Sequence, residues 1–211
     1  MTKYYINLPD EINNQMDEIL KYEIYKNPVI DIDKYPQQIL LIKNDITQIK
    51  ADVIVNAANA EGLGCFNHNH KCIDNVIHNK AGPKLRYQCN KILCGSKIET
   101  SNAIITDGFN LPAKYIIHTV GPIYDITQHD LCCKQLADCY INCLKLATNY
   151  NLKSIVFCCI STGLYRFPPA DAANIANTTV KDYLTKIQSN IKVVFCTYNE
   201  TDYKLYKKFF S

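Results

Sequence analysis

A short loop near residue 65 contains two cysteines and a histidine whose spacing suits a metal ion. Cys65 is followed by His70 and then by Cys72, in the pattern Cys-x4-His-x-Cys. Thiolate sulfur and imidazole nitrogen favour zinc, and three protein ligands leave a fourth position open to water or substrate. The alternative is a polar loop with unconnected thiols and solvated histidines, and His68 competes as a ligand. Spacing alone leaves these interpretations open.

The same loop follows an expected strand and precedes an expected helix. Residues 56–72 follow an apolar run at 53–55, and two of the seven glycines lie among them. Small residues let a ligand approach the backbone closely, and the helix N-terminus that follows favours an anion. Asp74 lies in the first turn of that helix, where an acid also stabilises the helix dipole without any ligand.

Two further loops carry polar residues after apolar runs. Ser161, Thr162 and Gly163 follow the run at 154–160. Such a turn ahead of a helix can present successive N–H groups to an anion, although ordinary turns use the same residues. Asp45 follows another run, and its carboxylate and the next amide could accept from and donate to an adenine-like edge; a simple polar turn is the alternative.

The elements that must position these loops alternate between two patterns. Apolar runs of strand length lie at 39–42, 53–55, 103–105, 115–120, 154–160 and 191–196. Helical patterns lie at 10–25, 72–92, 130–150, 169–187 and 201–210. This alternation predicts an α/β fold in which a sheet, covered on both faces, lies between helical layers. Ligands in such folds bind at the carboxyl ends of the strands, where these loops lie.

The chain is expected to form one core with an N-terminal extension. Residues 1–38 are predicted to be a helical extension, and 39–211 the α/β domain. In the extension, apolar residues recur at helical spacing, and in the helix at 130–150 they form one stripe. The apolar positions are Ile12, Met16, Ile19, Leu20 and Ile24 in the first, and Leu131, Leu136, Tyr140, Cys143, Leu144 and Ala147 in the second.

Composition excludes several classes of protein. With 47% apolar and 20% charged residues, the chain can bury a core. The 23 basic residues are scattered among 20 acidic ones, so duplex nucleic acid is not an expected partner. The N-terminus lacks the apolar core of a signal peptide and no run is long enough to cross a bilayer, so we expect a cytoplasmic protein, with nuclear access left open. The cysteines should then be reduced, nine of the eleven serving as core residues.

Five ordered segments together resemble the macrodomain, a module that binds and hydrolyses ADP-ribose linkages. The segments are NDIT (44–47), VIVNAAN (53–59), IDNVIHNKAG (73–82), TSNAIITDGFNLPAKYIIHTVGPIY (100–124) and CISTGLYRFPPADAANIANTTV (159–180). The resemblance implies a three-layer α/β/α sandwich around a mixed, mostly parallel sheet. GCFNHNHKC (64–72) further resembles the zinc-dependent branch of protein-ADP-ribose hydrolases. Ser101 and Asn44 stand where the family has glycine, and His68 where that branch has proline.

The resemblance also assigns roles to individual residues. Asp45 and the amide of Ile46 would hold adenine, with Tyr198 as an aromatic wall. The phosphates would be cradled by backbone amides from Ser161, Thr162, Gly163, Leu164 and Tyr165. Cys72, Ile73 and Asp74 would line the diphosphate and distal ribose, and Asn59 would contact that ribose. Zinc would be held by Cys65, His70 and Cys72.

The function expected from this resemblance is zinc-dependent hydrolysis of O-linked mono-ADP-ribose from modified protein side chains. Asp74 would orient or deprotonate the attacking water, and Asn59 would fix the ribose hydroxyls. ADP-ribosylated proteins would be the partners of a monomer, and free ADP-ribose the product. A reader that binds ADP-ribose without turnover is the alternative. A cysteine–histidine nucleophile with His118 as base is disfavoured, because an apolar run surrounds His118.

Overall fold

The fold is built on a six-stranded sheet with the strand order β2-β8-β7-β4-β6-β5. The computed structural model describes residues 10–67 and 69–210. Every neighbouring pair in this sheet is parallel except β5 with β6, which is antiparallel. The strands are β2 (Ile39–Lys43), β4 (Val53–Ala57), β5 (Ala103–Asp107), β6 (Tyr115–Thr119), β7 (Ser154–Phe157) and β8 (Lys192–Thr197).

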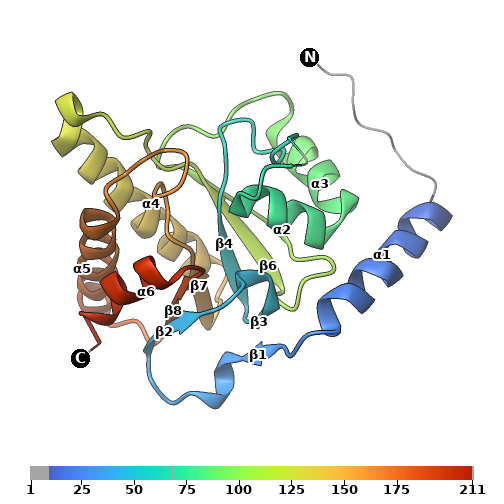
Figure 1. The fold of residues 1–211 in the computed structure, drawn as a ribbon, viewed down its shortest axis with the longest axis horizontal. Coiled ribbons are helices and arrows are strands. Elements are labelled where there is room, and N and C mark those ends of the chain that lie inside the picture. The colour runs from blue at the N-terminus through green and yellow to red at the C-terminus, as the bar shows by residue number, and fades with distance from the viewer. Residues whose placement is uncertain (1–9, 68, 211) are drawn as a thin grey trace.

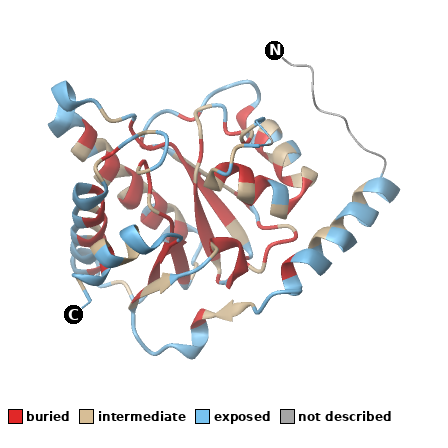
Figure 2. Cartoon of the chain, in the orientation of Figure 1, coloured by how far each residue is buried: buried red, intermediate tan, exposed pale blue. Residues whose placement is uncertain are grey.

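Helices cover both faces of the sheet, as Figure 1 shows. Helices α1 (Asp10–Tyr25), α2 (Ile73–Ala81) and α3 (Pro83–Leu93) lie on one side. Helices α4 (His129–Asn149), α5 (Pro169–Ile187) and α6 (Glu200–Lys207) lie on the other. The central strands are buried along nearly their whole length (Figure 2). Consecutive apolar residues suit strands covered on both faces. The predicted three-layer α/β/α sandwich with a mixed, mostly parallel sheet is therefore confirmed.

The single helix expected at 72–92 is wrong, because the chain forms two helices there. Gly82 ends α2 with φ of +93°, and Pro83 begins α3 at its first position. Proline has no N–H to continue the ladder of the preceding helix, and glycine adopts positive φ without a Cβ clash. The strand expected at 154–160 is also too long, since β7 ends at Phe157.

Two apolar stripes differ in part from the prediction. In α1, Ile24 is fully buried, but Ile12, Met16 and Ile19 are exposed. In α4 the predicted stripe is buried except for Leu131, which is 47% exposed near the start of the helix. Helical periodicity identifies the apolar face of a helix but not how far the neighbouring layer extends along it.

The N-terminal segment is attached to the domain by apolar, polar and backbone contacts: its Ile24 and Ile32 are fully buried in the main core. Asp17 of α1 pairs with Lys84 of α3 and accepts a hydrogen bond from Asn110. The short strand β1 (Ile30–Asp31) pairs in parallel with β3 (Ile49–Lys50), and the 3-10 helix η1 (Ile32–Lys34) follows it. Residues 1–9, which open the N-terminal stretch judged to lack a signal peptide, lie outside the described residues. Within the described ranges, no helix is both long and apolar enough to span a membrane.

All eleven cysteines carry free thiols, and six of them are buried. The expectation of nine core cysteines is wrong for Cys94, which is exposed at the end of α3, and only partly correct for Cys133 and Cys159. The φ of Cys94 is +48°, in the left-handed conformation that ends the helix. Its side chain therefore leaves the packed face of α3.

Candidate active site

One cavity of about 530 Å³ opens at the carboxyl ends of the parallel strands. Every residue assigned to the site from the sequence lines it, although these residues come from four separate segments, each after a different strand. They are Asp45, Ile46, Asn59, Cys65, His70, Cys72, Ile73, Asp74, Ser161, Thr162, Gly163, Leu164, Tyr165 and Tyr198. The parallel topology explains this convergence, because it directs the end of each strand to the same edge of the sheet.

The side chains of Cys65, His70 and Cys72 converge at one side of the cavity. Their potential ligand atoms all lie within 4.8 Å of one another, and Cys65 Sγ is 3.4 Å from His70 Nδ1. Tetrahedral zinc with bonds of about 2.3 Å to sulfur and about 2.0 Å to nitrogen places such atoms about 3.6 Å apart. Two half-buried thiols and an imidazole at this separation fit a zinc ion. His68, the competing ligand, lies outside the described residues.

The metal-ligand loop is tied to the start of α2. Cys72 is the N-cap residue of that helix, and its Sγ accepts a hydrogen bond from the backbone N–H of Asn75 at 3.4 Å. The Asn75 side chain donates to the carbonyl oxygens of Asn67 at 3.1 Å and His70 at 2.7 Å. Burial, together with the neighbouring Cys65 and Asp74, raises the pKa of the Cys72 thiol. A bound cation at this position would oppose that rise.

The loop after β7 has the properties of an anion cradle. Ser161 adopts a positive φ of 65°, which turns the chain before α5. The N–H groups of Thr162, Gly163, Leu164 and Tyr165 make no hydrogen bond to any other described residue. Several free N–H groups in succession form a concavity that binds phosphate oxygens. Gly121 packs against this loop, and a Cβ there would lie 2.0 Å from Ser161 Oγ, so the close approach requires glycine.

The adenine end expected from NDIT begins with the 3-10 helix η2 (Ile46–Gln48). Asp45 caps this helix, and its Oδ1 accepts from the N–H and the hydroxyl of Thr47 at 2.9 and 2.7 Å. Asn44, which stands at a glycine position of the family, is not among the residues with positive φ. Ser101, at the other such position, does adopt φ of +74°, and its hydroxyl donates to the Gln135 carbonyl at 2.9 Å.

Asp74 is buried in the wall of the cavity and held by two asparagines. Its Oδ1 accepts from Asn56 Nδ2 at 2.7 Å, and its Oδ2 accepts from Asn59 Nδ2 at 3.3 Å. Burial raises the pKa of the Asp74 carboxyl, while the Asn56 hydrogen bond and the Arg86 charge act in the opposite direction. A buried carboxylate with a raised pKa and a fixed orientation is suited to accept a proton.

A buried polar cluster lies behind Asp74, and only one of its members, His118, was considered from the sequence; its expected burial in an apolar run is confirmed. The cluster contains Asn56, His78, Cys89, Thr106 and His118, all buried. Burial lowers the pKa of His78 to about 2 and that of His118 to about 3, so both rings are neutral. The 3.6 Å contact between His78 Nε2 and Asp74 is therefore not an ion pair. Polar residues inside apolar runs were the available signal, since a buried polar side chain requires a partner.

Other lining residues were also not predicted. Cys158, Cys159 and Cys196 contribute three thiols to the cavity wall. Burial raises the pKa of Cys158 and Cys196 to about 12, so these thiols stay protonated at neutral pH. Tyr198, the expected aromatic wall, is 82% exposed at the mouth.

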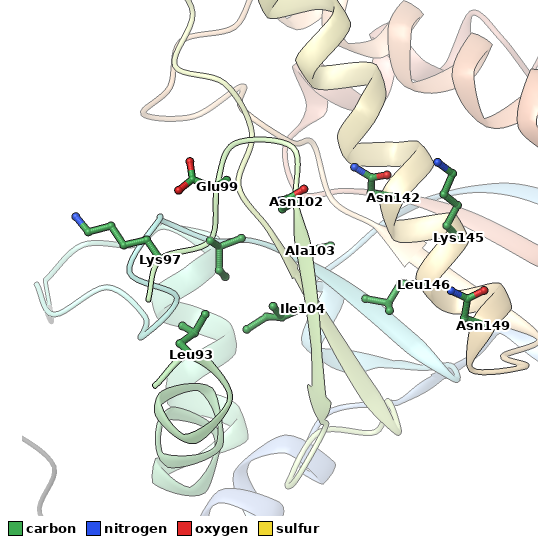
Figure 3. A pocket seen from close by; sticks show the side chains of 11 residues that line it. Leu93, Lys97, Glu99, Asn102, Ala103, Ile104, Asn142, Lys145, Leu146 and Asn149 are labelled. Carbon is green, nitrogen blue, oxygen red and sulfur yellow. The ribbon is translucent and has the colours of Figure 1, made fainter. Parts of the chain in front are cut away.

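A second cavity of about 360 Å³ lies beside the edge strand β5, between α3 and α4 (Figure 3). Figure 3 shows Asn102, Asn142, Lys145 and Asn149 around it. None of the residues assigned from the sequence lines it. The candidate active site is therefore the larger cavity, where the metal-ligand triad and the anion cradle meet.

The geometry and the fold agree with the comparisons to known proteins. The model of the Macro domain family matches residues 55–176. The chain belongs to the macro domain family. It is 48% identical over 176 residues to a protein-ADP-ribose hydrolase of Staphylococcus aureus strain MSSA476, and this match covers 82% of the chain and 66% of the relative. It is 40% identical over 217 residues to ADP-ribose glycohydrolase MACROD2 of Xenopus laevis, which covers 97% of the chain and 48% of that relative.

Solved structures show the same fold. A macrodomain of Oceanobacillus iheyensis with ADP matches with a TM-score of 0.72 and 40% identity, over 80% of this chain and 87% of that one. A Trypanosoma brucei macrodomain in complex with ADP-ribose matches with a TM-score of 0.77 and 28% identity, over 97% and 88% of the two chains. The chain thus spans most of these solved domains but less than two thirds of the curated relatives named above.

Proposed function

We propose that this chain removes O-linked mono-ADP-ribose from modified protein side chains, with a zinc ion held by Cys65, His70 and Cys72. The observation that carries the proposal is the position of the buried Asp74 carboxylate. It lies two residues after Cys72, in the wall of a cavity that also contains the free N–H groups of the anion cradle. The names of the staphylococcal and frog relatives, a protein-ADP-ribose hydrolase and an ADP-ribose glycohydrolase, support this reaction.

The remote parts of the ligand would position its reacting end. Asp45 and the Ile46 amide lie at the adenine end, and the loop from Ser161 to Tyr165 would take the diphosphate. Binding energy from these contacts can be used to orient the distal ribose. Asn59 would bind the ribose hydroxyls, since its amide already lies beside Asp74 and the Gly64 carbonyl.

Asp74 would accept a proton from the water that attacks the anomeric carbon of the distal ribose. The two asparagine amides hold both carboxylate oxygens, so the side chain keeps one orientation. A bound zinc ion would supply Lewis acidity at this end of the cavity by polarising an oxygen or lowering the pKa of a bound water. The water oxygen would form a bond to the anomeric carbon while the bond between that carbon and the side-chain oxygen breaks. The proton held by Asp74 would then pass to the leaving oxygen or to solvent, and ADP-ribose and the unmodified side chain would be released.

The zinc proposal is tested by measuring metal content and turnover together. Cys65→Ala removes one thiol ligand, and Cys94→Ala is its control because Cys94 is an exposed thiol outside the cavity. We expect Cys65→Ala to lose zinc by elemental analysis and to release ADP-ribose from a modified protein at least about 100-fold more slowly, the effect of losing a catalytic metal. Full turnover by a folded, zinc-free variant would refute catalytic zinc, whereas unfolding on metal loss indicates a structural ion.

The reaction and its linkage are tested with defined conjugates. Proteins or peptides carrying ADP-ribose on serine, aspartate or glutamate are incubated with the chain, and free ADP-ribose is measured by mass spectrometry. We expect release from at least one O-linked conjugate and its loss in Asp74→Asn. Tight binding of ADP-ribose without release from any conjugate would instead establish a reader, the alternative class.

A further inference from the structure

Asp74 is the end of a chain of buried hydrogen bonds that links three strands and one helix. The chain runs from Thr106 on β5 to His118 on β6, then to Asn56 on β4 and to Asp74 on α2. We propose that Thr106 and His118 are positioning residues, which fix the Asn56 amide so that it always presents a donor to the Asp74 carboxylate. The inference rests on the proposed function only for its effect on turnover.

The orientation of Asn56 follows from the two groups that face it. Asn56 Nδ2 lies 2.7 Å from Asp74 Oδ1 and 3.1 Å from His118 Nδ1, and an amide nitrogen has two hydrogens to donate. The reversed amide would place its oxygen against the carboxylate oxygen, with two acceptors in contact. This orientation is kept although Asn56 Oδ1 is buried without a hydrogen-bond partner among the described residues. The two donated hydrogen bonds therefore decide which way the amide faces.

The same network selects one tautomer of His118. Because Nδ1 accepts from Asn56, the ring proton lies on Nε2, and the ring is fully buried. Nε2 lies 3.0 Å from Thr106 Oγ1, which accepts a hydrogen bond from the Nε2–H group. Within the described part of the chain, the only other side-chain atom within hydrogen-bond range of this nitrogen is Cys89 Sγ, at 3.9 Å, and a thiol sulfur is a weak acceptor.

Thr106 therefore determines how the Asp74 carboxylate is oriented, although the two side chains are not in contact. Without its hydroxyl, Nε2–H loses its good acceptor, and the Nδ1–H tautomer becomes competitive. That tautomer presents a donor to Asn56 Nδ2, and the amide must reverse or move away. Either change removes the donor from Asp74 Oδ1, whose orientation then rests on the longer 3.3 Å bond between Asn59 and Oδ2.

The test compares three threonine substitutions. Thr106→Val keeps the size of the side chain and removes the hydroxyl, and Thr106→Ser restores a hydroxyl. Thr119→Val is the matched control: Thr119 is equally buried on β6, its hydroxyl donates to the Asn102 carbonyl at 2.9 Å, and it follows His118 directly, so it faces the other side of the sheet. We expect Thr106→Val to lower kcat about tenfold, the order of one hydrogen bond to a charged group, with the Kd for ADP-ribose within about twofold of wild type. Thr106→Ser and Thr119→Val should keep the wild-type kcat.

The tautomer gives a second measurement that does not depend on turnover. The ring nitrogens of His118 are observed by 15N NMR, in which the protonated and unprotonated nitrogens have different shifts. We expect an unprotonated Nδ1 in wild type, Thr106→Ser and Thr119→Val, and an Nδ1–H population in Thr106→Val. An unchanged kcat in Thr106→Val, in a background where the wild type is active, would overturn the inference. If the wild type releases no ADP-ribose from any conjugate, the proposed function fails. Separately, a protonated Nδ1 in the wild type would overturn the positioning chain, whether or not the protein is active.

Discussion

The two buried, neutral histidines make the stability of this domain dependent on pH. Burial holds the pKa of His78 at about 2 and that of His118 at about 3 in the folded chain, against 6.5 for an ordinary imidazole. Because the folded pKa values lie below the unfolded one, protons bind to the unfolded chain first as the pH falls. The contribution to stability is therefore complete above pH of about 6.5 and decreases below it.

The magnitude follows from the proton linkage. Between pH of about 7.5 and about 5.5, a histidine that titrates at about 6.5 only in the unfolded chain loses about 1.4 kcal/mol of the free energy of unfolding. His78 and His118 together then account for a loss of about 2.7 kcal/mol. Both folded pKa values lie more than two units below this window, so folded-state protonation contributes little.

The assay is urea unfolding at both pH values, followed by circular dichroism. His78→Phe replaces the ring by one that cannot be protonated, and it removes no hydrogen bond, since neither ring nitrogen of His78 has a hydrogen-bond partner among the described residues. On acidification, the free energy of unfolding should fall by about 1.4 kcal/mol less in the variant than in wild type. Contributions from carboxylates and metal are common to both proteins and cancel in this comparison. Ile77→Val, on the same helix and fully buried, is the control: it should lower stability by about 1 kcal/mol at both pH values without changing the loss. Equal losses in wild type and His78→Phe would refute the neutral buried imidazole.

Two substitution pairs test other parts of the structure. Gly64 and Gly95 have φ of +83° and +84°, but only at Gly64 would a Cβ meet a neighbour, His78 Cγ at 2.7 Å. Gly95→Ala should therefore lower the free energy of unfolding, measured with urea, by about 1 kcal/mol. Gly64→Ala should lower it by about 1–3 kcal/mol beyond that, and equal decreases would contradict the close packing at Gly64. Asp45→Ala should weaken ADP-ribose binding at least about tenfold by calorimetry, as for loss of charge-assisted hydrogen bonds. Asp125→Ala should not, although Asp125 caps its own 3-10 helix through the same bonds to Thr127; equal weakening would refute the adenine assignment.

Local features of the chain were predictable because neighbouring residues determine them. The apolar run from Val53 predicts a buried strand, and Cys72 followed by Asp74 marks the start of a helix. Gly82 and Pro83 also predict the break between α2 and α3, although a single helix was expected there. Which residues of α1 are buried could not be predicted from the sequence, because the exposed face of this helix depends on where the layer formed by α2 and α3 ends.

The repeated sequence DITQ separates the two kinds of information. It occurs at 45–48 and again at 125–128, and each copy forms a 3-10 helix capped by its aspartate. The sequence by itself therefore determined the turn. Only tertiary structure decided that the first copy borders the cavity and the second does not: Ile46 is 5% exposed and Ile126 is 75% exposed.

The features of the candidate site also separate into those that the sequence determined and those that only the tertiary structure decided. The sequence determined the kinds of ligand available: two thiols and an imidazole within eight residues, a turn with free N–H groups, and an acid at a helix start. Only the folded chain brought Asn56 against His118, which is 62 residues away. The pairing of β4 with β6 places them opposite each other, and hydrogen bonds require that proximity. The spacing of residues along a chain determines local structure, whereas the order of strands in the sheet determines which distant side chains meet.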